Sequence, residues 1–234
     1  MSDSRDRSST PQPDGHSTGG DRPTPSESCA ASRPYPDALL PGMGRQASVL
    51  HDDIETVLIN EQQITDALDV LGREIVEGFD GQEFTAVAVL KGAAVFVSDL
   101  IRRIPVPLEL AFVMASSYRK GTTAGQLDLD FFPNDAEIEG RRMLLVDDIL
   151  DTGNTMHTLK AALLARGAAD VKTAVFLDKP ARRAVEFEVD YRCFEIEDKF
   201  VVGYGLDFAG RYRNLPYVGA LKPSIFEAVL GKQG

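Results

Sequence analysis

The sequence LLVDDILDTGNT, residues 144–155, joins an apolar run to three aspartates and a glycine-containing turn. The apolar residues predict the end of a buried strand, with Asp147 and Asp148 at its tip. Gly153 allows the backbone to turn sharply and to approach a ligand closely. The residues after this glycine show helical spacing, so the stretch predicts a strand, a tight turn and a helix N-terminus in immediate succession.

The turn at residues 152–155 is typical of an anion site. The first amides of a helix point outward and the helix dipole favours negative charge, while Thr152 and Thr155 add hydroxyl donors. The neighbouring carboxylates suit sugar hydroxyls, a metal ion or a developing cation, and ribose 5-phosphate combines the two kinds of group. A Walker loop is excluded because the Gly-Lys-Ser/Thr ending is absent.

Apolar and amphipathic segments alternate on both sides of this turn. We expect strands at 83–90, 108–118, 141–148, 170–180 and 200–207, and helices at 60–79, 91–104, 154–167 and 223–231. This alternation predicts an α/β fold with a mostly parallel central sheet flanked by helices. Ligands bind such sheets beyond the carboxyl ends of the strands. A receiver domain also places two aspartates at a strand tip, but near its start, whereas here two strands and two helices come first.

Composition sets the remaining limits. The 234 residues carry a net charge of −11, which argues against binding nucleic acid through its phosphates. Residues 1–45 are rich in Ser, Pro, Asp and Gly, so we expect a disordered tail before one domain at 46–234. The start of the sequence lacks the apolar region of a secretory signal, no segment is long and apolar enough for a membrane span, and the two cysteines form no disulfide framework. We therefore predict a cytoplasmic protein.

Five motifs together carry a family resemblance. LLVDDILDTGNT resembles the diphosphate-sugar signature of the type I phosphoribosyltransferases, and LKGA, SSYRKGTTAG, FLDKPARR and DKFVVGYGLDFAGRYRNLP resemble the hypoxanthine–guanine branch over about residues 60–221. The resemblance implies the family fold with a small hood region. It also implies transfer of the 5-phosphoribosyl group from phosphoribosyl diphosphate to hypoxanthine, guanine or both, giving IMP or GMP and diphosphate.

The resemblance further implies Mg²⁺ as cofactor and a homo-oligomer, a dimer or tetramer. An alternative is a nucleotide-sensing regulatory protein of the same fold, which binds RNA through a basic face; the net charge of −11 counts against it. The preference among hypoxanthine, guanine and xanthine stays open, because the exocyclic groups of the base are read by backbone carbonyls.

By the same resemblance, Asp151 is the general base that takes the proton from purine N7. The phosphoribosyl group is bound by Asp147, Asp148, Thr152, Gly153, Asn154 and Thr155. The diphosphate is bound by Lys91, Gly92, Ser117, Tyr118 and Arg213, with the Lys91–Gly92 peptide in the cis form and Ser117 and Tyr118 on a closing loop. The purine is bound by Lys179, Phe200 and Val201, and Mg²⁺ by Asp207, Asp147 and Asp148.

The chain departs from the family pattern in three ways. Asp147 stands where a glutamate is usual, so its carboxylate reaches less far towards the ribose or the metal. Ala93 stands where a glycine often follows Lys91 and Gly92. Arg119 and Lys120 occupy loop positions where small residues are common. None of these departures removes a predicted catalytic group.

Overall fold

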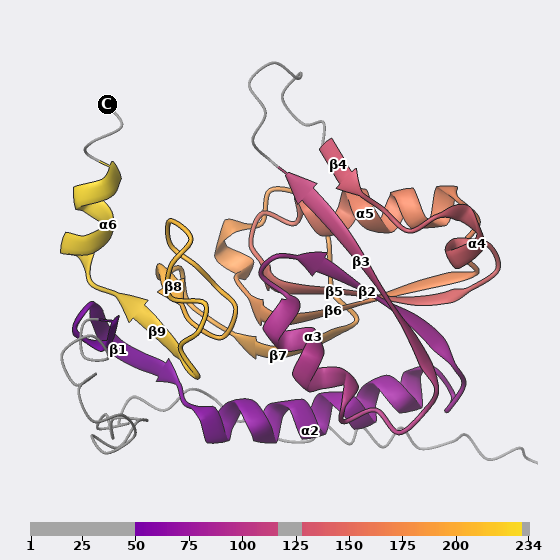
Figure 1. The fold of residues 1–234 in the computed structure, drawn as a ribbon, viewed down its shortest axis with the longest axis horizontal. Helices are drawn as coiled ribbons and strands as arrows, with labels where there is room; N and C mark the ends of the chain where they lie inside the picture. The colour runs from indigo at the N-terminus through magenta and orange to yellow at the C-terminus, as the bar shows by residue number, and fades with distance from the viewer. Residues whose placement is uncertain (1–49, 117–127, 231–234) are drawn as a thin grey trace, which may run out of the picture.

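A six-stranded sheet forms the centre of the molecule in the computed structural model, which describes residues 50–116 and 128–230 (Figure 1). The strands lie in the order β4 (Asp128–Phe131), β3 (Leu108–Ser116), β2 (Phe84–Leu90), β5 (Arg142–Leu150), β6 (Asp170–Asp178) and β7 (Tyr191–Glu195). Neighbouring strands from β3 to β7 are parallel, and β4 alone pairs antiparallel, with β3. The predicted mostly parallel sheet is therefore confirmed.

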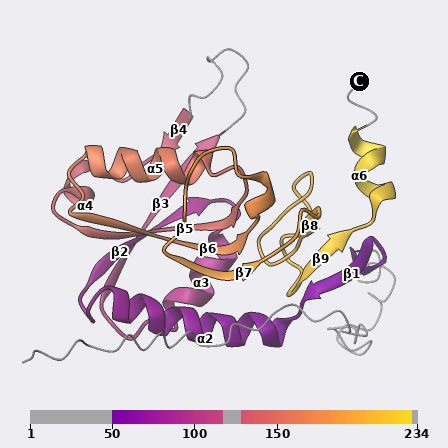
Figure 2. The ribbon, with the colours of Figure 1, turned by 180° about the vertical axis from the view of Figure 1, so that it is seen from behind.

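Helices cover both faces of this sheet (Figures 1 and 2). On one face lie α2 (Glu61–Gly78) and α3 (Ala94–Ile101), and on the other lie α4 (Asp135–Ile138) and α5 (Asn154–Ala165). Successive side chains of a strand point to opposite faces. In β5, Leu144 and Val146 accordingly pack in the core beneath α2 and α3, while Met143 and Leu145 pack beneath α4 and α5.

The long helix α2 begins where its sequence predicts. The Asn60 side chain accepts a hydrogen bond from the Gln63 amide, and the Gln63 side chain accepts one from the Asn60 amide. This reciprocal capping box satisfies two amides that the helix itself leaves without partners. Helix α2 ends at Gly78, and the C-cap Phe79 is fully buried.

A small second sheet forms the predicted hood beside the main sheet (Figure 1). Its strands are β1 (Ile54–Ile59), β9 (Val218–Leu221) and β8 (Val201–Val202), all antiparallel, and α6 (Pro223–Leu230) follows β9. A 3-10 turn, η1 (Pro180–Arg182), follows β6. The prediction missed β1, since only Ile59 of its six residues is buried and its sequence shows weak alternation.

The prediction of a fifth parallel strand at 200–207 was wrong. The fifth parallel strand is β7, and only Val201 and Val202 of the predicted segment form a strand, which belongs to the hood. The backbone after Val202 takes φ values of +99° at Gly203, +49° at Tyr204 and +100° at Gly205. These left-handed conformations end the strand at Val202.

The predicted tail at 1–45, the closing-loop residues Ser117 and Tyr118, and the Arg119–Lys120 departure lie outside the described residues. In the described part of the chain, no helix is both long and apolar enough to cross a membrane.

Candidate active site

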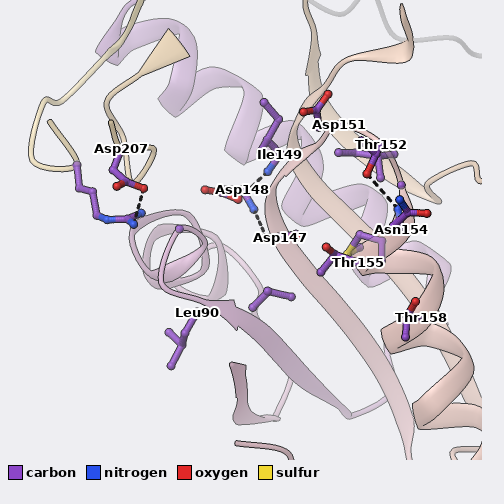
Figure 3. Close-up of a pocket in the computed structure, with 16 residues that line it drawn as sticks. Leu90, Asp147, Asp148, Ile149, Asp151, Thr152, Asn154, Thr155, Thr158 and Asp207 are labelled. Carbon is purple, nitrogen blue, oxygen red and sulfur yellow. Dashed lines mark hydrogen bonds and ion pairs between the residues drawn. The ribbon is translucent and has the colours of Figure 1, made fainter. Parts of the chain in front are cut away.

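A cavity of about 780 Å³ opens between the carboxyl ends of the central strands and the hood. Its lining includes Gly92 after β2, Asp147, Asp148 and Asp151 from β5 and the following turn, and Asp207 and Arg213 from the hood. Figure 3 shows the Asp148 carboxylate pointing towards the side of the cavity where Asp207 lies. The cavity therefore gathers predicted residues from segments that are far apart in the sequence.

The turn between β5 and α5 has the form expected of a phosphate site. Gly153 has φ +87°, and a Cβ added there would lie 2.9 Å from Val185 Cγ2, so glycine is required for two reasons. The Thr152 hydroxyl accepts a hydrogen bond of 3.4 Å from the Asn154 amide. Residues 152–155 all line the cavity at the start of the twelve-residue helix α5 (Figure 3). Such a helix N-terminus favours a bound anion.

The two adjacent aspartates of β5 are strongly perturbed. Asp147 is only 7% exposed, and its Oδ1 accepts a hydrogen bond of 2.9 Å from the Asp148 amide. Burial, and then the charge of Asp148, hold the pKa of Asp147 well above its usual range. Burial also raises the pKa of Asp148, although the nearby Arg213 opposes that rise. Two carboxylates that are expensive to charge together are suited to hydroxyl donors or a cation.

The hood brings an aspartate and an arginine to the opposite wall. Arg213 Nη2 lies 2.5 Å from Asp207 Oδ1, and Arg213 Nη1 donates to the Gly205 carbonyl. Asp207 Oδ2 accepts a hydrogen bond from the Gly210 amide. Both side chains line the cavity. A bound diphosphate could replace Asp207 as the ion-pair partner of Arg213, and the Asp207 carboxylate could then bind a metal ion.

The carboxylates fit one kind of magnesium site. No group of three or more His, Cys, Asp or Glu residues in the described segments is arranged to cage a metal. Mg²⁺ bound to a phosphorylated substrate takes most of its ligands from phosphate oxygens and water, and only one or two from protein carboxylates. Asp207, together with Asp147 and Asp148 across the same cavity, meets that smaller demand.

One expected detail of the diphosphate region was wrong. The cis peptide bond joins Leu90 to Lys91, and the Lys91–Gly92 peptide is trans. Gly92 lines the cavity and Lys91, which is exposed, does not. A Cβ on Gly92 would lie 1.8 Å from Asp148 Oδ2, so this glycine lets the backbone touch the carboxylate. Ala93 has φ −68°, an ordinary right-handed conformation, so replacing the family's glycine causes no backbone conflict there.

Asp151 is oriented by a residue that the sequence reasoning did not select. Arg182 Nε lies 3.2 Å from Asp151 Oδ1, and Arg182 Nη1 lies 3.8 Å from Asp198 Oδ1. Asp151 Oδ1 itself is buried and accepts no hydrogen bond from the described residues. The Asp151 side chain as a whole is 35% exposed and lines the cavity, so a ligand N–H can reach the rest of the carboxylate.

The predicted purine-binding residues lie beyond Asp151, outside the lining of the main cavity. Lys179 is 5% exposed, donates from Nζ to the Lys199 carbonyl at 2.5 Å and lies 3.8 Å from Asp198. Burial lowers the pKa of Lys179. Val201 is buried, whereas Phe200 is 42% exposed and meets Phe208 edge-on, with 5.2 Å between the ring centroids. Part of the Phe200 ring is therefore exposed at the surface.

Comparison with known proteins agrees with this geometry. The family model described as "Phosphoribosyl transferase domain" matches residues 57–209. A hypoxanthine-guanine phosphoribosyltransferase of Streptococcus pneumoniae is 42% identical over 178 residues, which cover 76% of this chain and 99% of that protein. The bifunctional protein TilS/HprT of Listeria monocytogenes is 45% identical over 178 residues, and the match spans 76% of this chain but only 27% of the Listeria protein's length.

Solved structures give the same result. A crystal structure of a hypoxanthine phosphoribosyltransferase from Staphylococcus aureus superposes with a TM-score of 0.69 at 39% identity, covering 76% of this chain and 97% of that one. A hypoxanthine phosphoribosyltransferase mutant from Trypanosoma cruzi, complexed with the product IMP, gives a TM-score of 0.71 at 31% identity, covering 76% and 96%.

Proposed function

Because this chain belongs to the phosphoribosyl transferase family, we propose that it transfers the 5-phosphoribosyl group from phosphoribosyl diphosphate to hypoxanthine, guanine or both. The products are IMP or GMP and diphosphate, and the role is purine salvage. One observation carries the proposal: the turn at residues 152–155, the adjacent Asp147 and Asp148, and the Asp207–Arg213 pair all line one cavity. Lys179 lies just beyond Asp151, which also lines it.

The sugar substrate would lie along this cavity. The amides and hydroxyls of residues 152–155 bind its 5′-phosphate, and Asp147 and Asp148 accept hydrogen bonds from the ribose 2′ and 3′ hydroxyls. Gly92 and Arg213 bind the diphosphate. When bound, Mg²⁺ neutralises diphosphate charge, and Asp207 with Asp147 and Asp148 would hold it.

The base would lie between Lys179 and Phe200. Lys179 donates to purine O6, which selects a 6-oxo over a 6-amino base, because a 6-amino group offers no acceptor at that position. Phe200 stacks on the ring, and the backbone of Val201 contacts its edge. The place of Asp151 in the cavity lining, with its side chain 35% exposed, supports its assignment as the group that accepts the N7 proton.

The reaction balances with these groups alone. Purine N9 forms a bond to ribose C1′ as the bond from C1′ to the diphosphate oxygen breaks, and the diphosphate leaves with that electron pair. The N7 proton passes to Asp151. Positive charge develops on the ribose ring at the transition state, where the nearby carboxylates Asp147 and Asp148 favour it.

The other expectations stay predictions. They are the domain at 46–234 with its tail at 1–45, a dimeric or tetrameric assembly, the cytoplasmic location, and the diphosphate and lid roles of Lys91, Ser117 and Tyr118. Nothing specific favours the nucleotide-sensing alternative, since the relatives described above carry phosphoribosyltransferase names.

The direct test is product formation. Full-length protein with phosphoribosyl diphosphate, Mg²⁺ and either hypoxanthine or guanine should produce the matching nucleoside monophosphate and an equal amount of diphosphate, measured by chromatography. Tight binding of nucleotide without any turnover would instead favour the regulatory alternative.

A further inference from the structure

Arg183 ties the backbone at residues 150–151, called here the catalytic turn because it carries Asp151, to the end of the neighbouring strand β6. Its Nη1 donates to the carbonyl oxygen of Asp151 at 2.8 Å and to that of Leu150 at 3.2 Å. Its Nη2 pairs with Asp178 Oδ1 at the last residue of β6. The side chains of Arg183 and Asp178 are 17% and 6% exposed, so this bridge is screened from solvent far better than a surface ion pair.

The same two segments are also joined through their backbones. The Lys179 amide donates to the Leu150 carbonyl at 2.9 Å, and the Ala184 amide donates to the Thr152 carbonyl at 2.9 Å. Residues 178–184 thus run along residues 150–152. Lys179, the proposed O6 donor, belongs to the first of these segments, and Asp151, the proposed N7 base, belongs to the second.

The bridge requires a guanidinium. One side chain reaches two carbonyl oxygens and a carboxylate, and the planar fork of arginine holds its donors in fixed directions. A lysine ammonium carries the same charge on a shorter, flexible stem and cannot reproduce this geometry. The Arg183 Cδ also lies 3.1 Å from where a Gly153 Cβ would be, so the stem packs against the phosphate turn as well.

We propose that Arg183 is a positioning residue for the transfer reaction: by bridging Asp178 and the Leu150 and Asp151 carbonyls, it fixes the catalytic carboxylate relative to Lys179. This inference rests on the proposed function. N7 and O6 belong to one rigid purine, so their partners must keep a set separation for both contacts to form at once. Arg182, by contrast, reaches the Asp151 carboxylate from a side chain that is 49% exposed, and does not hold its backbone.

The chain offers a matched control for this role. Arg192 Nη1 also lies 3.4 Å from Asp178, at Oδ2, and its Nη2 lies 3.4 Å from Glu195, which places it on the β7 side of the carboxylate. Arg183→Lys and Arg192→Lys therefore each remove a guanidinium from Asp178, but only the first breaks the link to the catalytic turn.

The experiment compares both variants with the wild type by single-turnover formation of IMP, with enzyme in excess over phosphoribosyl diphosphate. We expect Arg183→Lys to slow this step by about 10- to 100-fold, as small displacements of a catalytic group do. We expect the KM for phosphoribosyl diphosphate, the IMP-binding stoichiometry and the melting temperature to stay close to those of Arg192→Lys. Asp178→Asn, which weakens the same bridge while keeping its shape, should slow the step in the same direction.

Two outcomes would overturn the inference while leaving the proposed function intact. Equal single-turnover rates in Arg183→Lys and Arg192→Lys would show that the bridge does not position the base. A slower rate matched by a proportional loss of IMP-binding sites would show a purely structural role. If Arg183→Lys fails to fold, Asp178→Asn decides, and a wild-type rate in that variant rejects the inference. A wild type that forms no IMP would reject the proposed function and this inference together.

Discussion

The guanidinium of Arg182 lies 3.2 Å from the carboxylate of Asp151, and the oxygen it approaches is buried without a hydrogen-bond donor. Arg182 therefore supplies positive charge beside Asp151 without completing its hydrogen bonding. The Asp151 side chain is 35% exposed at the cavity, so a purine N7–H can reach this carboxylate beside the guanidinium.

Replacing Asp151 with asparagine should remove the proton acceptor and keep the shape of the turn. We expect kcat to fall by about 10²- to 10⁴-fold, the range that general base catalysis supplies. IMP affinity, measured by calorimetry, should change little. Asp198→Asn is the control, because Asp198 also faces Arg182 and its side chain is 55% exposed. Asp198 lies 3.8 Å from Lys179 as well, so this variant can change the affinity for the base but should keep proton transfer. Wild-type turnover in Asp151→Asn would reject Asp151 as the base.

The affinity for hypoxanthine should depend on the charge of Lys179. Burial lowers the pKa of Lys179 from 10.5, so its ammonium loses a proton at a lower pH than a solvated lysine does. Affinity should therefore fall as pH rises through that lowered pKa. Lys179→Arg keeps its positive charge and should not show this fall in affinity. Ionisation of hypoxanthine itself affects the wild type and the variant alike. If calorimetry shows the same dependence of hypoxanthine affinity on pH in the wild type and in Lys179→Arg, the assignment of Lys179 as the donor to O6 is contradicted.

A methyl group at Gly92 should displace Asp148. The added Cβ would lie 1.8 Å from Asp148 Oδ2 and 2.4 Å from its Cγ, so the carboxylate must move. We expect the KM for phosphoribosyl diphosphate in Gly92→Ala to rise about tenfold or more, a loss of about 1.4 kcal/mol. Gly81→Ala adds a methyl that meets nothing within 4 Å, although Gly81 has φ +65°. That control should lose some stability and keep its KM; an unchanged KM in Gly92→Ala would show that Asp148 does not contact the sugar.

Tyr204 joins the hood to helix α3 of the main domain, beside the proposed diphosphate site. Its hydroxyl donates to Asp99 Oδ2 at 2.7 Å, and burial together with this bond raises the pKa of Tyr204. The next residue, Gly205, packs so closely that a Cβ added there would lie 2.3 Å from the Gly92 carbonyl oxygen. Tyr204→Phe should reduce the free energy of unfolding by about 1.5–3 kcal/mol, the range for a hydrogen bond to a charged group, as measured by urea denaturation.

The matched control is Tyr212→Phe, which removes a hydroxyl that donates to Asp53 at 2.7 Å. Both variants should be destabilised, but only Tyr204→Phe should also raise the KM for phosphoribosyl diphosphate, by a few-fold. An equal KM in the two variants would show that the Tyr204 contact stabilises the fold without shaping the substrate site.

Local sequence patterns were sufficient for the strands at 84–90 and 142–150, the Asn60 cap of α2 and the turn at 152–155, because each depends on neighbouring residues. Strand β7 was missed because only Cys193 and Phe194 of its five residues are buried. The contact between Arg183 and Leu150 spans 33 positions and exists only after β5 and β6 pair. The doubled arginine after LDKP was visible in the sequence, but which partner each arginine takes was not.

The central claim is that this protein is a 6-oxopurine phosphoribosyltransferase. The most direct single measurement is the ratio of kcat/KM for hypoxanthine to that for adenine, taken with saturating phosphoribosyl diphosphate and Mg²⁺. The account predicts a ratio of about 10³ or more, because adenine leaves the buried Lys179 without its acceptor. A ratio near one, or turnover of adenine alone, would contradict the account.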